Sequence, residues 1–249
     1  MKFEPEVLYE DDDIIAINKP AGLVVHSDGR TKEPSVSEWL VGFRTEAKGV
    51  GEHVDLDDEE TIDRSGIVHR IDRETSGVLL LVKTEAGFQS LKKQFQNREI
   101  EKIYHLFVYG NLKDDFGTIN LPITRSKADF RKRVAQPASA ESSGAAKEAL
   151  TYFKVLSRDE KGEATFVEAK PKTGRTHQIR VHFKAWHHPV VCDSLYTSKK
   201  PSLLGFNRLA LHARSITFTN TLGEKVTIEA PYPQDFKQAM DRIGFGVLD

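Results

Sequence analysis

The chain has little of what secreted and membrane proteins require. Its 249 residues include a single cysteine, Cys192, which cannot form an internal disulfide and therefore favours a reducing compartment. The longest purely apolar run, residues 78–82, is far shorter than the roughly 20 residues that cross a bilayer. The first residues, MKFEPEVLYEDDD, lack the basic and apolar regions of a secretory signal. Together these absences argue against a secreted or membrane protein and predict the cytoplasm.

Sequence motifs for common cofactors and nucleophiles are also missing. The chain contains no GxGxxG, no P-loop and no GxSxG elbow. Six of its nine histidines could suggest a metal site: His69, His177, His182, His187, His188 and His212. Their spacing is poor, because His177 and His182 are five residues apart on one predicted helix and so point in different directions. We therefore predict no cofactor and no metal. A metal-assisted hydrolase that uses the histidines is kept as an alternative. It predicts that the purified protein contains bound metal.

The chain has no overall charge excess, since 36 basic residues oppose 37 acidic ones and the net charge is -1. Any binding of nucleic acid must then depend on where the charges lie. Two clusters are strongly basic: Lys170, Lys172, Arg175, Arg180 and Lys184, and Arg125, Lys127, Arg131, Lys132 and Arg133. Such faces can neutralise phosphates. The alternative is an ordinary solvated surface, balanced by the acidic segment 42–66.

Hydrophobic periodicity predicts an α+β fold. Thr84 can cap a helix with Phe88, Leu91 and Phe95 on one side, Thr176 can cap a second helix, and a third follows Pro233. Too few helices are predicted for a doubly wound parallel sheet. A mixed, mainly antiparallel sheet flanked by helices fits better. We expect loops at 42–66 and 139–147, and strands at 13–18, 23–26, 78–82, 102–109, 149–156, 165–169, 215–219 and 225–229.

The segment HRIDRETSG, residues 69–77, carries the most specific chemistry. Arg70 and Arg73 flank Asp72, and nearby positive charges favour the ionised carboxylate. An ionised carboxylate can attack carbon, and this one lies in a loop that leads into a buried strand. The alternative interpretation is a surface ion-pair cluster that contributes little.

Five segments, in this order and spacing, resemble the RluA-type family of RNA pseudouridine synthases between about residues 7 and 233: KPAGLVVH (19–26), HRIDRETSGVLLLVKT (69–84), YHLFVYG (104–110), TGRTHQIRVHF (173–183) and RLALHA (208–213). The resemblance implies a cytoplasmic isomerase that converts uridine in rRNA or tRNA to pseudouridine without cofactor or metal. It implies one catalytic domain over residues 1–249, with a central cleft. We expect a monomer that contacts RNA but no membrane. Because about six residues precede its first strand, we expect no S4-like domain of the kind that many members carry.

The resemblance also assigns roles to individual residues. Asp72 matches the catalytic aspartate, which would act on a uridine extruded from the RNA. Tyr104 matches a tyrosine that stacks on the uracil, although a core aromatic is the alternative. Arg180 matches the basic residue that pairs with the aspartate, and Arg175 is a rival that the sequence does not exclude.

Two further positions are weaker matches, and two features depart from the family. Arg70 is expected to support the RNA backbone or to fill the gap left by the flipped nucleotide. Leu211 is expected to pack on the uracil or in the core. Ile71 and Arg73 vary the common HRLD spelling without changing charge or bulk much. The acidic segment 42–66 would repel phosphates in a cleft, so we expect it to turn away or to act as a flap.

Overall fold

The computed structural model describes residues 4–27, 33–55, 61–136, 146–197 and 200–246. Within them the chain divides into two compact units, which are described one at a time. Unit 1 comprises Met1–Glu101 with Ala213–Pro231, and unit 2 comprises Lys102–His212 with Tyr232–Asp249. The prediction of one catalytic domain over residues 1–249 is not tested by this division and stays a prediction.

Unit 1 is built on antiparallel strands. β1 (Glu6–Glu10), β2 (Ile14–Lys19) and β5 (Ser76–Val82) lie side by side, followed by β12 (Leu211–Thr219) and β13 (Lys225–Glu229). The register of β2 and β5 runs from Ile14 opposite Val82 to Lys19 opposite Gly77. All seven residues of β5 are buried, as its continuous apolar run predicts.

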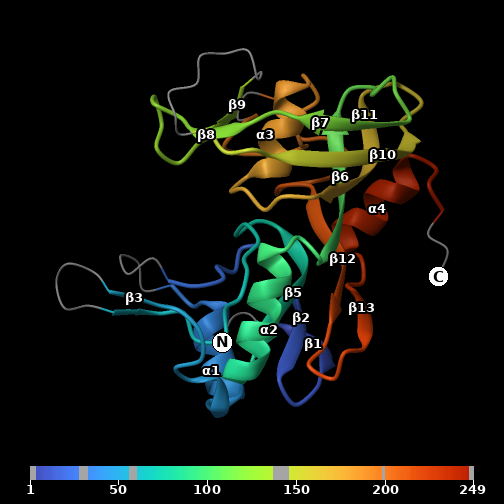
Figure 1. The fold of residues 1–249 in the computed structure, drawn as a ribbon. Coiled ribbons are helices and arrows are strands. Elements are labelled where there is room, and N and C mark those ends of the chain that lie inside the picture. The colour runs from blue at the N-terminus through green and yellow to red at the C-terminus, as the bar shows by residue number, and fades with distance from the viewer. Residues whose placement is uncertain (1–3, 28–32, 56–60, 137–145, 198–199, 247–249) are drawn as a thin grey trace. The chain divides into compact units, whose positions relative to one another are not determined.

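Two helices accompany these strands. α1 (Val36–Phe43) begins with a capping box between Ser35 and Glu38, and the sequence analysis did not predict it. α2 (Glu85–Gln96) is capped by Thr84, as predicted, and buries Phe88 and Leu91. Figure 1 shows α2 beside β5. Within the described residues, no helix is long and apolar enough to span a membrane.

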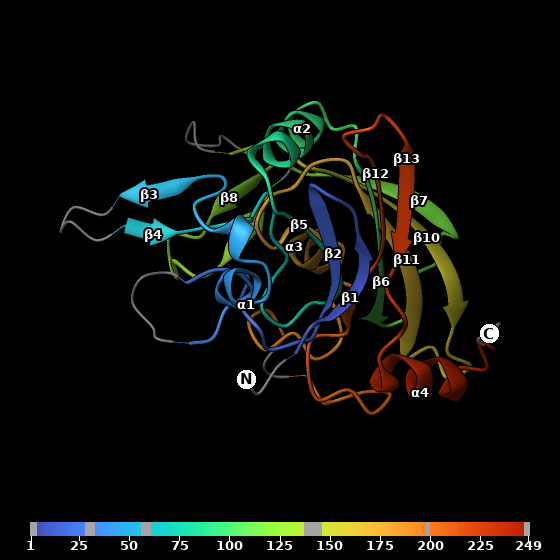
Figure 2. The same ribbon diagram turned by 90° about the horizontal axis from the view of Figure 1, so that it is seen from below.

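The segments around α1 differ from the sequence prediction. The strand predicted at 23–26 is wrong, because the carbonyls of Val24 and Val25 accept from the first amides of α1 and leave only one bridge, to Ser35. The predicted loop 42–66 contains a 3-10 turn, η1 (Thr45–Ala47), and two short paired strands. Figure 2 shows these strands, β3 (His53–Asp55) and β4 (Thr61–Asp63), side by side.

Unit 2 is also built on antiparallel strands. Its order is β6 (Glu101–Tyr109), β11 (Ala164–Pro171), β10 (Leu150–Arg158) and β7 (Phe116–Asn120). A separate two-stranded ribbon pairs β8 (Ile123–Arg125) with β9 (Arg133–Ala135). The predicted linker 139–147 lies outside the described residues, apart from 146 and 147.

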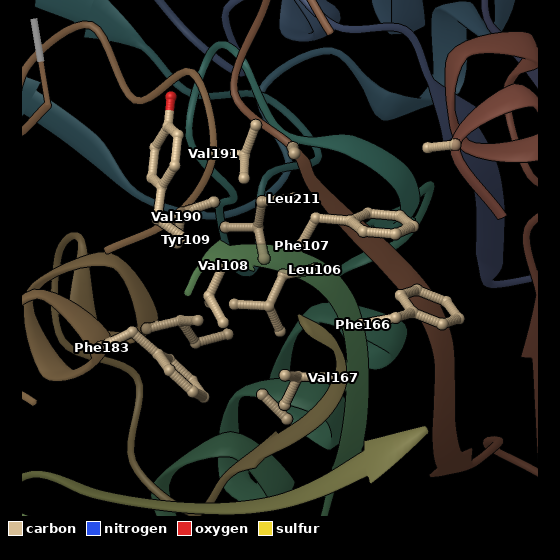
Figure 3. Close-up of a cluster of buried hydrophobic side chains, with 14 of the residues drawn as sticks. Leu106, Phe107, Val108, Tyr109, Phe166, Val167, Phe183, Val190, Val191 and Leu211 are labelled. Carbon is tan, nitrogen blue, oxygen red and sulfur yellow. The ribbon is translucent and has the colours of Figure 1, made fainter. Parts of the chain in front are cut away.

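The two helices of unit 2 pack on opposite faces of its sheet. α3 (Gln178–Ala185) places Phe183 against Phe153, and α4 (Gln234–Arg242) places Phe236 against Phe107. The ladder puts Phe153 opposite Ala169 and Ala169 opposite Tyr104, so Tyr104 shares the α3 face. The core that results is drawn in Figure 3. The predicted α+β class, with its mainly antiparallel sheet and flanking helices, is confirmed.

The start of α3 corrects one prediction. The cap residue is His177, in the left-handed region at φ 58°, and not Thr176. The first turn is stabilised without a hydroxyl cap, because the backbone amide of Gln178 donates to the Arg175 carbonyl and the Gln178 side chain accepts from the Arg175 amide. The predicted helix after Pro233 is α4, with Pro233 as its cap residue.

Candidate active site

In unit 1, the loop 69–77 is fastened to the turn that follows β2. Lys19 is fully buried, and its ammonium group donates to the carbonyls of Pro20, Leu23 and Arg73 at 2.8, 2.9 and 3.0 Å. The Gly22 amide donates to the same Arg73 carbonyl at 2.9 Å, and Arg73 Nε donates to the Gly22 carbonyl at 3.1 Å. A buried ammonium with three acceptors is satisfied and rigid. The residue that follows Asp72 is thus fixed through its backbone.

The residues before Asp72 are fixed through side chains. Arg70 donates to Nε2 of His26 at 3.0 Å, while Nδ1 of His26 lies 2.8 Å from the Ser27 carbonyl. His69 accepts from the Leu80 amide at 2.9 Å and stacks on Phe95, with ring centroids 4.7 Å apart. The contact between Arg70 and His26 joins the segments KPAGLVVH and HRIDRETSG, which are more than 40 residues apart in the sequence.

Asp72 is half-buried between these two anchors. Its carbonyl accepts from the Thr75 amide at 3.1 Å, which closes a tight turn, and Ile71, Thr75 and Ser76 are buried around it. Desolvation lowers the pKa of Arg70, but the negative charge of Asp72 opposes that shift. The carboxylate therefore lies within electrostatic reach of a permanent cation.

Gly77 completes the loop because no other residue fits there. Its φ is 107°, a conformation that side chains rarely adopt, and a Cβ atom would lie 2.2 Å from the Ala213 carbonyl oxygen. The close approach of β12 to the end of the loop therefore requires glycine.

In unit 2, Arg180 forms a buried, bidentate ion pair. Its Nε and Nη2 atoms donate to the two carboxylate oxygens of Asp193 at 2.7 and 2.8 Å, and the Asp193 side chain is only 1% exposed. The Arg180 guanidinium also lies over the Tyr196 ring, 5.1 Å from its centre. The guanidinium direction is therefore fixed from two sides.

Arg175 is held differently, through the buried amide of Gln178. This amide oxygen accepts from Thr173 Oγ1 at 2.7 Å and from the Arg175 amide at 3.0 Å. The amide nitrogen donates to the Leu150 carbonyl and to Thr151 Oγ1, both at 3.0 Å. The Arg175 guanidinium donates to the Glu148 carbonyl at 3.0 Å. The GRTHQIR loop is thereby tied to β10.

The other predicted residues of unit 2 lie on its sheet. Tyr104 is half-buried in β6 and packs against the hydrophobic core, and Leu211, at the start of β12, is 4% exposed within that core. Figure 3 labels Leu211 among Leu106, Phe107 and Val191. Lys102 shares the face of Tyr104, and desolvation followed by repulsion from Lys172 lowers its pKa.

Sequence reasoning overlooked four residues that shape these loops: Lys19, Gln178, Asp193 and Tyr196. One signal was available for Asp193, because it is the first acidic residue after Glu168, beyond the whole basic stretch. Among the described residues, no three His, Cys, Asp or Glu side chains converge in a way that could hold a metal ion.

Comparison with known proteins identifies the family. A family model described as RNA pseudouridylate synthase matches residues 13–185, which include both anchored loops and α3. The chain belongs to the RNA pseudouridine synthase family. This confirms the resemblance from the sequence, and its members are isomerases.

Similar proteins from other organisms match nearly the whole of this chain in sequence. An uncharacterised RNA pseudouridine synthase of Aquifex aeolicus is 39% identical across 93% of this chain and 70% of its own. One from Synechocystis sp. is 36% identical across 94% and 68%. The ribosomal large subunit pseudouridine synthase C of Vibrio vulnificus is 32% identical across 95% and 69%.

Solved structures support the same fold. The human RNA pseudouridylate synthase domain containing 4 covers 96% of this chain and 93% of its own with a TM-score of 0.73, at 23% identity. The human domain containing 1 covers 92% and 84% with a TM-score of 0.70, at 24% identity.

The predicted site of this pseudouridine synthase is thus divided by sequence between two described units. Asp72 and Arg70 belong to unit 1, and Tyr104, Arg175, Arg180 and Leu211 belong to unit 2. The pairing of Asp72 with Arg180 or Arg175, and the contacts of Tyr104 and Leu211 with uracil, stay predictions.

Proposed function

We propose that this protein converts a uridine of rRNA or tRNA to pseudouridine in the cytoplasm, with Asp72 as the nucleophile. The observation that carries the proposal is the rigid presentation of Asp72 in a chain of this family. Lys19 holds the loop through the Arg73 carbonyl, and His69 holds it through the amide of Leu80 in β5. Arg70 supplies a nearby positive charge. A carboxylate presented in this way is suited to covalent catalysis.

The reaction exchanges one bond of the nucleotide for another. The uridine leaves the RNA stack, which costs a few kcal/mol, and enters the site. The Asp72 carboxylate bonds covalently to the nucleotide while the N1–C1′ bond breaks. The uracil then turns and C5 bonds to C1′, while the bond between Asp72 and the nucleotide breaks and the free carboxylate is restored. The C5 proton leaves and N1 gains a proton, so that no atom is gained or lost. Tyr104 stacks on the base, and Arg180 supports the carboxylate charge.

The basic surfaces of unit 2 support an RNA substrate. In the β8–β9 ribbon, Asp129 is paired with Arg131 at 2.9 Å and with Lys132 at 3.7 Å. The Arg131 hydrogen bond lowers the pKa of Asp129 to about 2. The remaining cations of this ribbon, together with those of the GRTHQIR region, can contact phosphates and offset the cost of extruding a base.

Asp72→Asn tests the proposal with little change in size. Purified wild type is expected to form pseudouridine in total RNA from a strain that lacks the gene, as mapped at nucleotide resolution. The Asn variant is expected to lose about 10³-fold or more of that rate, since the amide cannot attack. It is expected to keep most RNA binding and the same unfolding midpoint.

Glu74→Gln is the matched control, because it removes a carboxylate from the same loop two residues away. It is expected to retain activity within about threefold of wild type. Equal activity of wild type and Asp72→Asn would reject Asp72 as the nucleophile. Rescue of a knockout phenotype by Asp72→Asn would instead favour a non-catalytic RNA-binding protein, and loss of activity with a chelator would favour a metal-assisted enzyme.

A further inference from the structure

Tyr196 connects two parts of unit 2 that are far apart in the sequence. Its hydroxyl accepts from the backbone amide of Arg133, in β9, at 2.8 Å. The same hydroxyl lies 2.9 Å from Nδ1 of His177, the residue that starts α3. Because the hydroxyl accepts from Arg133, its own proton is available for the histidine nitrogen.

The residue that Tyr196 contacts has an unusual backbone. His177 lies in the left-handed region, at φ 58° and ψ 19°, which costs a non-glycine residue of the order of 1 kcal/mol or more. Such a conformation persists only where neighbouring groups fix it. The Tyr196 hydroxyl contacts the imidazole of His177, and the Tyr196 ring adds an edge-on contact with the His177 ring at 5.7 Å.

Arg180 depends on this turn. The first helical hydrogen bond of α3 runs from the Val181 amide to the His177 carbonyl at 3.0 Å, so the conformation of His177 sets the direction of the helix that carries Arg180. Tyr196 also acts at the other end of the Arg180 side chain. Its ring lies beneath the guanidinium, and its amide donates to Asp193 Oδ1 at 3.1 Å, which orients the ion-pair partner.

We propose that Tyr196 is a positioning residue of the active site, whose hydroxyl holds the turn at His177 and thereby the direction in which α3 presents Arg180. The proposal rests on the proposed function, in which Arg180 supports the Asp72 charge during catalysis. It assigns Tyr196 to the chemical step and not to RNA binding. Since positional errors of about 1 Å can cost up to 100-fold in rate, loss of this hydroxyl is expected to reduce kcat.

Tyr196→Phe tests this directly, because it keeps the ring beneath Arg180 and removes only the hydroxyl. Once the position of the target uridine is mapped, an unmodified transcript that contains this uridine serves as substrate. We expect kcat to fall about tenfold, with KM within about twofold of wild type. Tyr152→Phe, an exposed tyrosine of β10, is the matched control and should behave as wild type in both constants.

In the comparison of Tyr196→Phe with wild type, three outcomes of the kinetic and unfolding measurements would overturn the proposal. The first is a kcat within twofold of wild type. The second is a rise in KM at unchanged kcat, which would assign the hydroxyl to RNA binding through the ribbon. The third is a loss of rate that matches the loss of folded protein in thermal unfolding, which would show a merely structural role.

A double-mutant cycle tests the route through His177. His177→Asn keeps a residue that tolerates the left-handed region but removes the imidazole. If the hydroxyl acts through His177, Tyr196→Phe is expected to lower kcat little further in the His177→Asn background. Additive losses would overturn the proposal, because the hydroxyl would then not act through His177.

A readout without RNA separates this proposal from the proposed function. Amide hydrogen exchange of Gln178 and Val181, which donate to the carbonyls of Arg175 and His177, is expected to be at least about tenfold faster in Tyr196→Phe, with α4 unchanged. Unchanged exchange would overturn the positioning role, whatever the activity of the enzyme. Conversely, faster exchange in a protein that makes no pseudouridine would reject the proposed function alone.

Discussion

At the scale of single residues, Gly77 is where backbone geometry most directly restricts the chemistry of the loop. Gly77→Ala combines a positive φ with a Cβ only 2.2 Å from the backbone of Ala213. Because neither strand can yield without breaking the register of β5, we expect a destabilisation of about 3 kcal/mol or more. Urea unfolding measures this difference directly.

Gly42→Ala is the control for that substitution. Gly42 lies in α1, and a Cβ there would meet nothing within 4 Å. Alanine also favours the helix, so a gain of about 0.5 to 1 kcal/mol is expected. Similar effects of the two substitutions would show that the strand does not approach Gly77 so closely.

Individual site residues could be predicted only where their neighbours in the same sequence motif indicate their chemistry. The flanking arginines identified Asp72 as an electrostatically supported carboxylate, and the structure places Arg70 within its reach. The partner of Arg180 was not predictable from periodicity, although Asp193 is the first acidic residue after the basic stretch. Asp193 lies 13 residues further on, after a left-handed Cys192, and neither helical nor strand periodicity relates the two positions.

At the scale of elements, α3 is joined to β10 by a chain of buried polar groups. His182 is fully buried, with Nδ1 2.9 Å from Thr151 Oγ1 and Nε2 3.0 Å from the Leu121 carbonyl. Thr151 Oγ1 accepts from Gln178, so its proton is available for Nδ1. The Leu121 carbonyl can only accept, so Nε2 carries a proton, and the imidazole is neutral when the Thr151 hydroxyl donates to Nδ1.

These buried polar groups predict that the free energy of unfolding depends on pH. Burial lowers the pKa of His182 below its ordinary value of 6.5, so the unfolded chain binds its proton first as the pH falls. The contribution of His182 is therefore complete above pH 6.5 and is lost progressively below it. His182→Gln cannot titrate and is expected to be about 1 to 2 kcal/mol less stable at pH 8. On acidification, its stability should converge with that of wild type.

Urea unfolding between pH 8 and pH 5 measures the two curves. His187→Asn is the control, because it removes an exposed histidine beside α3 and keeps a residue that tolerates the left-handed region. Its curve should run parallel to that of wild type. A parallel curve for His182→Gln as well would contradict the role assigned to burial.

The elements that sequence patterns predicted are those that bury many side chains. The runs in β2, β5 and β6 and the spacing in α2 are apolar and long enough to identify. Besides β3 and β4, which lie in the predicted loop 42–66, the missed strands are β1, β7, β8 and β9. These four are short and carry exposed residues, so their hydrogen bonds, and not an apolar pattern, define them. The strand predicted at 23–26 failed because its carbonyls serve α1.

At the scale of the whole molecule, charge is balanced in total but uneven along the chain. Acidic residues gather in 42–66 and basic ones in the ribbon and near α3. A single net value of -1 therefore conceals the surfaces that an RNA would meet. Because counterions leave these surfaces when phosphates bind, salt dependence reports on them more directly than affinity at one salt concentration.

The ribbon can be tested in this way with the double variant Arg125→Ala/Lys127→Ala. In the Asp72→Asn background, the logarithm of transcript affinity is expected to depend less steeply on the logarithm of salt concentration, by about 1 to 2 units for two lost contacts. Filter binding between 50 and 300 mM salt measures this slope. Lys161→Ala is the control, because Lys161 lies among Asp159, Glu160 and Glu163 and should not face phosphates. An unchanged slope in the double variant would mean that RNA does not contact the ribbon, since a lost phosphate contact must release fewer counterions.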